Sequence, residues 1–269
     1  MMPRFSPVSS CGSLFRFFSL TVAATLFAGM LTLPNSAHAQ GLLQGPSPTL
    51  STGTAPQGVA AADFNRSGWI GMVVSDSTNK SLKVYLGTGP NTFGGASTIP
   101  TCTNPTAVLA KDFNKDGYPD IVVACTTGNF VELFLNDGTG HFGSAAVTQA
   151  VNRPVSLAEG DFTGNGLMDI AIASSTGSVT VILDLGNSSS VTTIAVSGTL
   201  TGLVAGDFNH DGRLDLAISD SANNNVHILA GNGSGGFSAL GNYSTGAGTK
   251  PSGIVAADFN TDGNLDLAT

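Results

Sequence analysis

The stretch DFNKDGYPD, residues 112–120, sets the pattern for most of this 269-residue chain. It returns as DFNHDGRLD at residues 207–215 and as DFNTDGNLD at residues 258–266. Two divergent copies, DFNRSGWIG at residues 63–71 and DFTGNGLMD at residues 161–169, lie among them. The first aspartates of the five copies are 49, 49, 46 and 51 residues apart. A near-constant period of this size is typical of solenoids and propellers.

Each period carries the same succession of signals. A run rich in small residues, such as GVAAADF or AVLAKDF, leads into the acidic stretch, and a β-branched run such as IVVA or IAIA follows it. An alternating run such as VELFLN and a Gly-rich turn such as NDGTGHFGS complete the period, although the third period has LGNSSSVTT in place of that turn. These are strand and turn signals, and the repeats contain no amphipathic helix pattern. Three or four short strands in about 50 residues make one propeller blade.

The sequence therefore predicts an all-β fold, a β-propeller built from four-stranded blades of about 49 residues. The motif supplies four full repeats and the first half of a fifth, which ends inside its second strand at Thr269. A blade that ended there would leave an open sheet edge. We therefore expect a fragment that is incomplete at its C-terminus, with a five-bladed ring closed by residues 40–55 as the alternative.

The combination of motif and period resembles a known family. DFNxDGxxD followed by DIVVA or DLAIS, and then by a turn ending in Phe-Gly at residues 93–94 and 142–143, is similar to the FG-GAP/VCBS repeats. The resemblance covers roughly residues 55–269. It implies a β-propeller, often of seven blades, with calcium-binding hairpin loops like those of the integrin α-chain propellers.

The acidic stretch has the side chains of a calcium site. Counted from its first Asp, positions 1, 3, 5 and 9 are Asp, Asn, Asp and Asp in the three intact copies. Calcium takes six to eight oxygen ligands from such groups, whereas no Cys or His recurs to suggest zinc or copper. Position 6 is Gly in all five copies, as a sharp turn requires. Position 12 is Val123, Ile218 or Thr269 rather than the Glu that an EF-hand needs, so a hairpin site is expected.

The resemblance adds the backbone carbonyl of position 7 to this ligand set. The predicted calcium ligands are Asp112, Asn114, Asp116, Tyr118 and Asp120; Asp207, Asn209, Asp211, Arg213 and Asp215; and Asp258, Asn260, Asp262, Asn264 and Asp266.

The two divergent copies are weaker candidates. The copy at Asp63 has Ser67 and Gly71 in place of acids, and we expect an empty turn. The copy at Asp161 keeps Asp169 but has Thr163 and Asn165, which leaves weak binding open. A turn that binds nothing is the alternative for any single copy, because Asp, Asn and Gly suit turns. The threefold recurrence of one ligand pattern favours calcium.

The N-terminus has the order of a secretory signal. Arg4 and Arg16 flank an uncharged run at residues 17–33, and Ala37-His38-Ala39 follows it. This order predicts a signal peptide at residues 1–39 that is cleaved after Ala39. A membrane anchor is the alternative, although the run is short for a span. Residues 40–54 then form a linker or an N-terminal strand, and residues 55–269 form the propeller, in a product that is secreted, extracellular or periplasmic and not inserted in a membrane.

Cleavage would remove Cys11 and leave Cys102 and Cys125. Cys125 ends one expected strand and Cys102 lies just before its neighbour, so contact is possible. An oxidising compartment permits a disulfide between them, and two free buried thiols are the alternative.

The charge distribution narrows the function classes. The chain has a formal net charge of −8, and twelve of its 18 acidic residues lie in the five copies of the stretch. An acidic surface argues against nucleic acid as a partner. The three His residues after the signal do not recur, and no G-x-S-x-G or H-E-x-x-H motif occurs, so we expect no enzyme.

The expected function is an adhesion or protein-interaction module with structural calcium, whose partner is an extracellular protein or glycan. A lectin-like propeller is one alternative, for which Trp69 and Tyr118 are the candidate sugar contacts. A non-catalytic module of a longer secreted enzyme is another.

Overall fold

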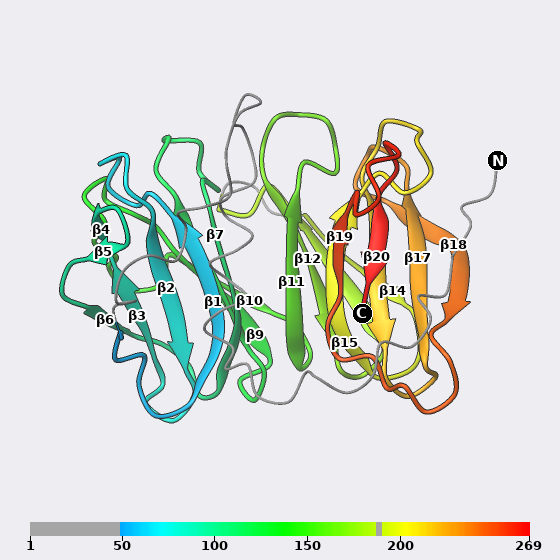
Figure 1. Ribbon diagram of the computed structural model, residues 1–269, viewed down its shortest axis with the longest axis horizontal. Helices are drawn as coiled ribbons and strands as arrows, with labels where there is room; N and C mark the ends of the chain where they lie inside the picture. The colour runs from blue at the N-terminus through cyan, green and yellow to red at the C-terminus, as the bar shows by residue number, and fades with distance from the viewer. Residues whose placement is uncertain (1–48, 187–189) are drawn as a thin grey trace. The chain divides into compact units, whose positions relative to one another are not determined.

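The computed structural model describes residues 49–186 and 190–269, and this part of the chain consists of strands joined by turns (Figure 1). The predicted signal at residues 1–39 lies outside the described residues. Residues 49–55 form no strand, and β1 begins at Pro56. Within the described ranges there is no helix of the length and apolar character needed to cross a membrane.

Four antiparallel sheets follow one another along the chain, each with four strands that neighbour one another in sequence order. Sheet 1 contains β1 (Pro56–Ala62), β2 (Gly71–Asp76), β3 (Ser81–Tyr85) and β6 (Ser97–Pro100), with the small hairpin β4 (Gly87–Gly89) and β5 (Thr92–Phe93) inserted. Sheet 2 contains β7 (Pro105–Lys111), β8 (Asp120–Cys125), β9 (Phe130–Phe134) and β10 (Val147–Ala150). Sheet 3 contains β11 (Pro154–Gly160), β12 (Asp169–Ser174), β13 (Ser178–Leu183) and β14 (Ser190–Ala195). Sheet 4 contains β15 (Leu200–Gly206), β16 (Asp215–Asp220), β17 (Asn225–Gly231) and β18 (Phe237–Ser244), and the hairpin of β19 (Val255–Ala257) and β20 (Asp266–Ala268) follows.

The acidic stretch joins the first strand of each sheet to the second. We number these connections loop 1 (residues 63–71), loop 2 (112–120), loop 3 (161–169), loop 4 (207–215) and loop 5 (258–266). The predicted all-β architecture of repeated four-stranded sheets, with one loop per repeat, is confirmed.

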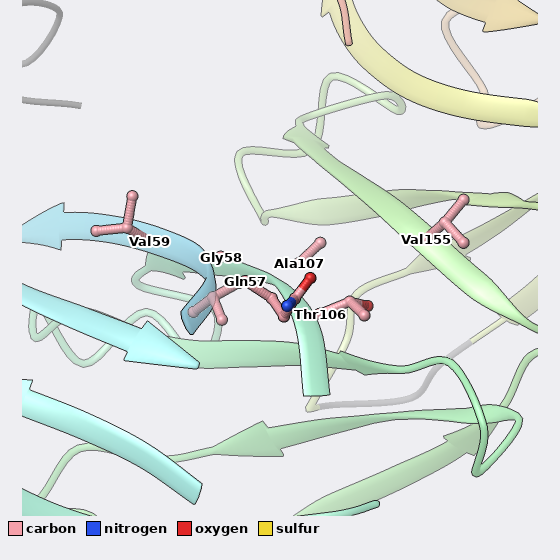
Figure 2. Close-up of a pocket in the computed structure, with 7 residues that line it drawn as sticks. Gln57, Gly58, Val59, Thr106, Ala107 and Val155 are labelled. Atoms are coloured by element: carbon pink, nitrogen blue, oxygen red, sulfur yellow. The ribbon is translucent and has the colours of Figure 1, made fainter. Parts of the chain in front are cut away.

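The first strands of consecutive sheets pack beside one another, from β1 through β7, β11 and β15 to β19. Their small residues permit this approach: a Cβ added at Gly58 would lie 2.3 Å from the Thr106 carbonyl oxygen of the next sheet. A pocket of about 390 Å³ lies between β1, β7 and β11 and is lined by residues such as Val59, Ala107 and Val155 (Figure 2). No titratable side chain lines it.

The second strands are the most deeply buried part of each sheet. Every residue of β8, β12 and β16 is buried, whereas the fourth strand β14 is almost wholly exposed. Side chains alternate between the two faces of a strand. A neighbouring sheet covers each face here, so both sets of side chains must be apolar or small, and this accounts for runs such as IVVA and IAIA.

The cores between sheets depend on the Phe at position 2 of loops 1, 2 and 3. Phe64, Phe113 and Phe162 are between 1% and 3% exposed and lie in three successive hydrophobic clusters. The Phe64 ring makes an edge-to-face contact with Phe142, which belongs to the Gly-rich turn of the next repeat, with a centroid distance of 5.7 Å. Phe162 pairs in the same way with Phe237 at 5.3 Å.

The same turns bind the phenylalanine backbone. The Phe64 carbonyl accepts a hydrogen bond from the Asn136 side chain at 2.7 Å, and the Phe162 carbonyl accepts one from the Gly235 N–H at 3.0 Å. The third repeat lacks this turn, and Leu185 shares the cluster with Phe113 instead. Loops 1 and 3 are therefore hydrogen-bonded to the sheets that follow them, and loop 2 contacts its neighbour through the shared cluster.

The end of the second strand is tied to the segment that enters the first strand. In sheet 1, Asp76 accepts hydrogen bonds from the N–H groups of Thr54 and Ala55, at 3.0 and 3.2 Å. In sheet 4, Asp220 accepts one from the Thr199 N–H at 3.0 Å. In sheet 2 the tie is covalent, because Cys102 and Cys125 form a disulfide with a Cα–Cα distance of 5.8 Å. Of the two alternatives for these cysteines, the structure contains the disulfide.

We expect Phe113→Ala to lower the free energy of unfolding by about 3–5 kcal/mol, because it opens a cavity in a buried core. Phe259→Ala is the matched control, since the same loop position in the last hairpin is 52% exposed. It should cost much less. Urea unfolding of both variants measures the difference, and equal losses would contradict this account of the core.

Candidate metal centres in the repeated loops

The first aspartate closes each loop. Asp112 accepts hydrogen bonds from the N–H groups of positions 5 and 6, Asp116 at 3.2 Å and Gly117 at 2.7 Å. The same pair of bonds recurs in the other four loops. Loop 1 is included, although it lacks acids at positions 5 and 9. The loop conformation therefore needs only the first carboxylate.

The glycine at position 6 is required by its backbone conformation. Its φ lies between 80° and 88° in all five loops, in the left-handed region where a side chain is strained. This confirms the sharp turn that the sequence predicts.

Positions 3 and 5 continue the chain of contacts across the tip of the loop. The Asn114 side-chain oxygen accepts a bond from the Asp116 N–H at 3.0 Å, and the Asp116 carboxylate accepts one from the Tyr118 N–H at 2.8 Å. Loops 4 and 5 repeat both bonds. The three intact copies thus share one arrangement. Loop 1 forms the same two bonds, with the Ser67 hydroxyl in place of the second carboxylate, so the arrangement does not depend on an acid at position 5.

The aspartate at position 9 has a role that the sequence reasoning missed. Asp120 is fully buried, and its two carboxylate oxygens accept hydrogen bonds from the N–H groups of Phe113 and Asn136, each at 3.0 Å. Asp169 and Asp215 are equally buried and bind the corresponding N–H groups of their repeats. This carboxylate joins the position-2 Phe to the C-terminal end of the third strand or to the one or two residues beyond it. The sequence did contain a signal for this role, because the aspartate at position 9 directly precedes the most apolar run of each repeat.

Burial also changes the acidity of these groups. Burial raises the pKa of Asp120 to about 6, and the nearby charge of Asp116 adds to the increase, while hydrogen bonds from Asn136 and Phe113 oppose it. Burial raises the pKa of Asp169 and of Asp215 as well.

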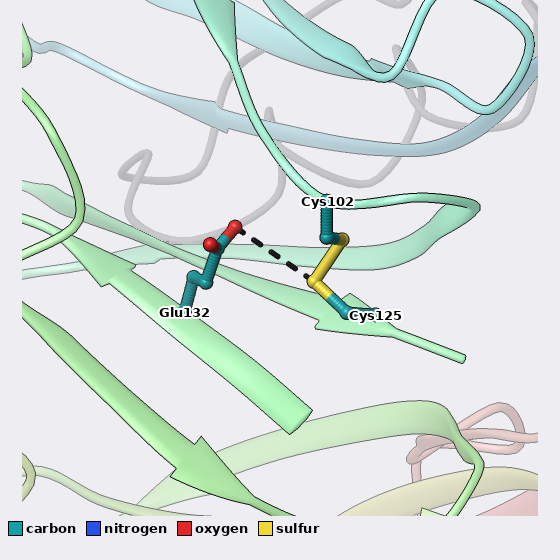
Figure 3. Close-up of side chains that lie close together, drawn as sticks. All are labelled: Cys102, Cys125 and Glu132. Atoms are coloured by element: carbon teal, nitrogen blue, oxygen red, sulfur yellow. Dashed lines mark hydrogen bonds between the residues drawn. A yellow bond between two sulfur atoms is a disulfide. The ribbon is translucent and has the colours of Figure 1, made fainter. Parts of the chain in front are cut away.

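The carboxylates of one loop do not form a tight cluster. Among the described residues, one group of three His, Cys, Asp or Glu ligand atoms lies within 4.8 Å of one another, and it consists of Cys102, Cys125 and Glu132 (Figure 3). Both sulfurs belong to the disulfide, so neither is free to bind a metal as a thiolate. Glu132 instead accepts a hydrogen bond from the Thr101 hydroxyl at 2.5 Å.

The intact loops nevertheless have the donors that calcium prefers. All their side-chain donors are oxygens, the ligand type of this ion. An ionised carboxylate has about four lone-pair sites, so the two N–H bonds to Asp120 leave capacity for a cation. The predicted ligand set fits calcium in its chemistry, and its assignment stays a prediction.

Loop 3 uses its first carboxylate more heavily. Although burial raises the pKa of Asp161, hydrogen bonds from Gly166, Gly164, Asn165 and Thr163 lower it overall below its ordinary value. These bonds engage both carboxylate oxygens within the loop.

The repeated sheets and the loop between their first and second strands define a β-propeller repeat protein. The model of the FG-GAP-like repeat matches residues 68–123, 112–172, 161–218 and 207–269. The chain therefore belongs to the FG-GAP-like repeat family, and the resemblance drawn from the sequence is confirmed.

Solved structures of similar fold include three at low sequence identity. BBS1N, crystallised in complex with ARL6DN and soaked with lead, has a TM-score of 0.52 and 13% identity over 71% of this chain and 58% of that one. A functionally unknown protein from Desulfotomaculum acetoxidans has a TM-score of 0.53 and 18% identity, over 71% and 56%. A protein from Lactobacillus plantarum has a TM-score of 0.50 and 17% identity, over 75% and 59%.

This chain thus spans less than two-thirds of each of these structures, and the likeness shows the fold alone. No curated protein matches the sequence significantly.

The raised pKa of Asp120 gives a pH dependence that can be measured without calcium. Because the folded pKa of about 6 exceeds the ordinary value of 3.8, the folded state holds this proton more tightly than the unfolded state. The resulting stabilisation is complete below about pH 4 and is lost as the pH rises through about 6.

We therefore expect the difference in unfolding free energy between the wild type and Asp120→Asn to fall between about pH 4 and pH 7 and to be flat above that range. Urea unfolding in a chelating buffer at stepped pH measures it. A difference that stays constant over the whole range would refute the assignment.

Proposed function

We propose that this chain is an exported, calcium-stabilised propeller module that serves adhesion or protein interaction. The FG-GAP-like repeats and the propeller-like neighbours suggest a protein-interaction module. The calcium part rests on one observation: loops 2, 4 and 5 place Asp, Asn and Asp at positions 1, 3 and 5 of one hydrogen-bonded arrangement, whereas loop 1 has the same arrangement with Ser67 in place of the second acid.

The ion would be held by the side chains of positions 1, 3, 5 and 9 and by the carbonyl of position 7. The positive charge of the ion would stabilise the loop by offsetting the negative charges of its aspartates. In loop 4 the charges of Asp207 and Asp211 add to the effect of burial in raising the pKa of Asp215, so these acids repel one another when ionised. A divalent cation relieves that repulsion. Because the Phe at position 2 enters the core between sheets, a stabilised loop also stabilises the contact with the next sheet.

Export is supported by two independent features. One is the order of basic flank, apolar run and A-x-A site in the first 39 residues. The other is the Cys102–Cys125 disulfide, since disulfides persist mainly in oxidising compartments.

The interaction role is supported by a neighbour of similar fold, BBS1N, which was crystallised in complex with ARL6DN. The pocket between β1, β7 and β11 has no titratable side chain, which favours binding over catalysis for this region.

The lectin alternative depends on exposed aromatic rings. Trp69 is 41% exposed. The Tyr118 ring, however, lies under the Arg66 guanidinium, with 4.2 Å between the guanidinium carbon and the ring centroid. Since Arg66 covers one face of this ring, a sugar could not stack on that face of Tyr118, and Trp69 remains as the candidate aromatic contact.

We therefore expect a glycan array to show no binding that depends on Trp69. Wild type and Trp69→Ala should give the same signals, because the proposed partner is a protein. Binding to a defined glycan that is lost in Trp69→Ala would favour the lectin instead.

Calcium itself should stabilise the fold. With a dissociation constant of about 10⁻⁴ M, about 10 mM calcium adds about 2.7 kcal/mol for each site. We expect the melting temperature to rise with calcium and to fall on chelation. The triple variant Asp112→Ala, Asp207→Ala and Asp258→Ala should lose most of this response in differential scanning calorimetry.

Asp63→Ala is the matched control, because it removes the same carboxylate from a loop that is not expected to bind calcium. It should lower the melting temperature with and without calcium and keep most of the calcium-dependent increment, because the carboxylates of loops 2, 4 and 5 are all retained. Titration calorimetry that finds no calcium uptake by the wild type would refute the proposal.

A further inference from the structure

Position 4 of the loops carries a basic residue in three of the five copies. Arg66, Lys115 and His210 occupy it in loops 1, 2 and 4, and their φ values are 54°, 63° and 61°. The recurring left-handed conformation gives this position the same backbone geometry in each of these loops.

Arg66 shows where such a side chain can reach. Its Nε and Nη2 atoms donate hydrogen bonds to the Gly117 carbonyl of loop 2, at 3.0 and 2.5 Å. Its guanidinium also lies over the ring of Tyr118. A Cβ on Gly117 would lie 1.8 Å from Nη2, so any other residue at this position would displace the guanidinium from this place. Loop 1 is therefore docked on positions 6 and 7 of loop 2.

Lys115 extends the pattern to the next pair of loops. Its amino group lies 3.4 Å from the point where a Cβ on Gly166 of loop 3 would stand. In both cases the basic residue at position 4 of one loop reaches the glycine at position 6 of the next loop. Loop 3 has Gly164 at position 4 and has no side chain to extend toward loop 4.

We propose that Arg66 of loop 1 places a fixed positive charge on loop 2. This contact holds loop 1 in place and weakens the binding of calcium to loop 2. This inference rests on the calcium binding proposed above. Loop 1 has Ser67 and Gly71 where the intact loops have acids, and it supplies a guanidinium that stays charged at any working pH. That charge lies against Gly117 and Tyr118, which follow Asp116 in the chain. It therefore opposes the binding of a second cation by Asp116.

The effect should be modest because the contact is exposed. Repulsion between a monovalent and a divalent cation through water and salt corresponds to roughly a two- to fivefold change in the dissociation constant. The coupling is reciprocal, so calcium in loop 2 should also loosen the Arg66 contact and move loop 1.

The test uses the full chain with Asp207→Ala and Asp258→Ala, in which loop 2 is the remaining intact copy. Titration calorimetry with calcium chloride compares this protein with and without Arg66→Gln. Loss of the charge should lower the dissociation constant about two- to fivefold at low ionic strength, and about 0.5 M sodium chloride should narrow the gap. Arg66→Lys keeps the charge and should stay near the parent value, which separates charge from folding defects.

Trp69 gives a second readout because it is the single tryptophan of the chain and lies in loop 1. Its fluorescence should change when calcium is added to the parent protein, and the change should be smaller in Arg66→Gln. The converse variant is Gly164→Arg in a chain that keeps loop 4 and carries Asp112→Ala and Asp258→Ala. It should raise the dissociation constant of loop 4.

The outcomes separate the two proposals. Calcium uptake with an unchanged or higher dissociation constant in Arg66→Gln would overturn the role of Arg66 and leave calcium binding standing. If neither the parent protein nor Arg66→Gln takes up calcium at millimolar concentration, calcium binding at loop 2 itself is overturned.

Discussion

The fold depends on a carboxylate that binds two neighbouring backbone N–H groups. In every loop the first aspartate accepts hydrogen bonds from positions 5 and 6, as Asp112 does from Asp116 and Gly117. Such N–H groups at a tight turn have no strand partner, and leaving them unsatisfied would be costly. Once this turn is closed, the second strand begins at position 9, and in loops 1 to 3 the Phe at position 2 enters the core between sheets. The loop thus determines both how a sheet starts and how it meets the next one.

The local pattern of the sequence was sufficient for the parts of the fold that repeat. The period, the order of strands and turns and the loop between the first two strands could all be predicted, because each depends on residues close together in the chain. Contacts between distant residues could not. The bond from Arg66 to Gly117 joins residues 51 positions apart, and no property of either residue identifies the other. The disulfide remained open for the same reason, since spacing alone does not give the distance between two strand ends.

The candidate site was predictable in its residue types but not in the duties of each residue. Positions 1, 3 and 5 carry the oxygen-bearing side chains that calcium prefers. Position 9 is different, because Asp120 is buried and both its oxygens accept N–H bonds, one from Phe113 in the same loop and one from Asn136 beyond the third strand. An aspartate that begins a strand and an aspartate that binds a cation look the same in a sequence. The burial of Asp120 in the structure reveals its role in holding the strand end, and its remaining lone pairs still leave room for a cation.

The pairing of loop and turn phenylalanines has a consequence for how such a chain can grow. Each full repeat except the third carries a loop Phe, which needs a cover, and a turn Phe, which covers the loop Phe of the preceding repeat in the Phe64–Phe142 and Phe162–Phe237 pairs. A duplicated copy therefore brings both halves of the contact with it and can join its neighbours without any new complementary surface. The family matches run from one loop into the next, so each match spans parts of two sheets. Duplication of one repeat can therefore lengthen this architecture one step at a time, because each added repeat carries the contact that joins it to its neighbour.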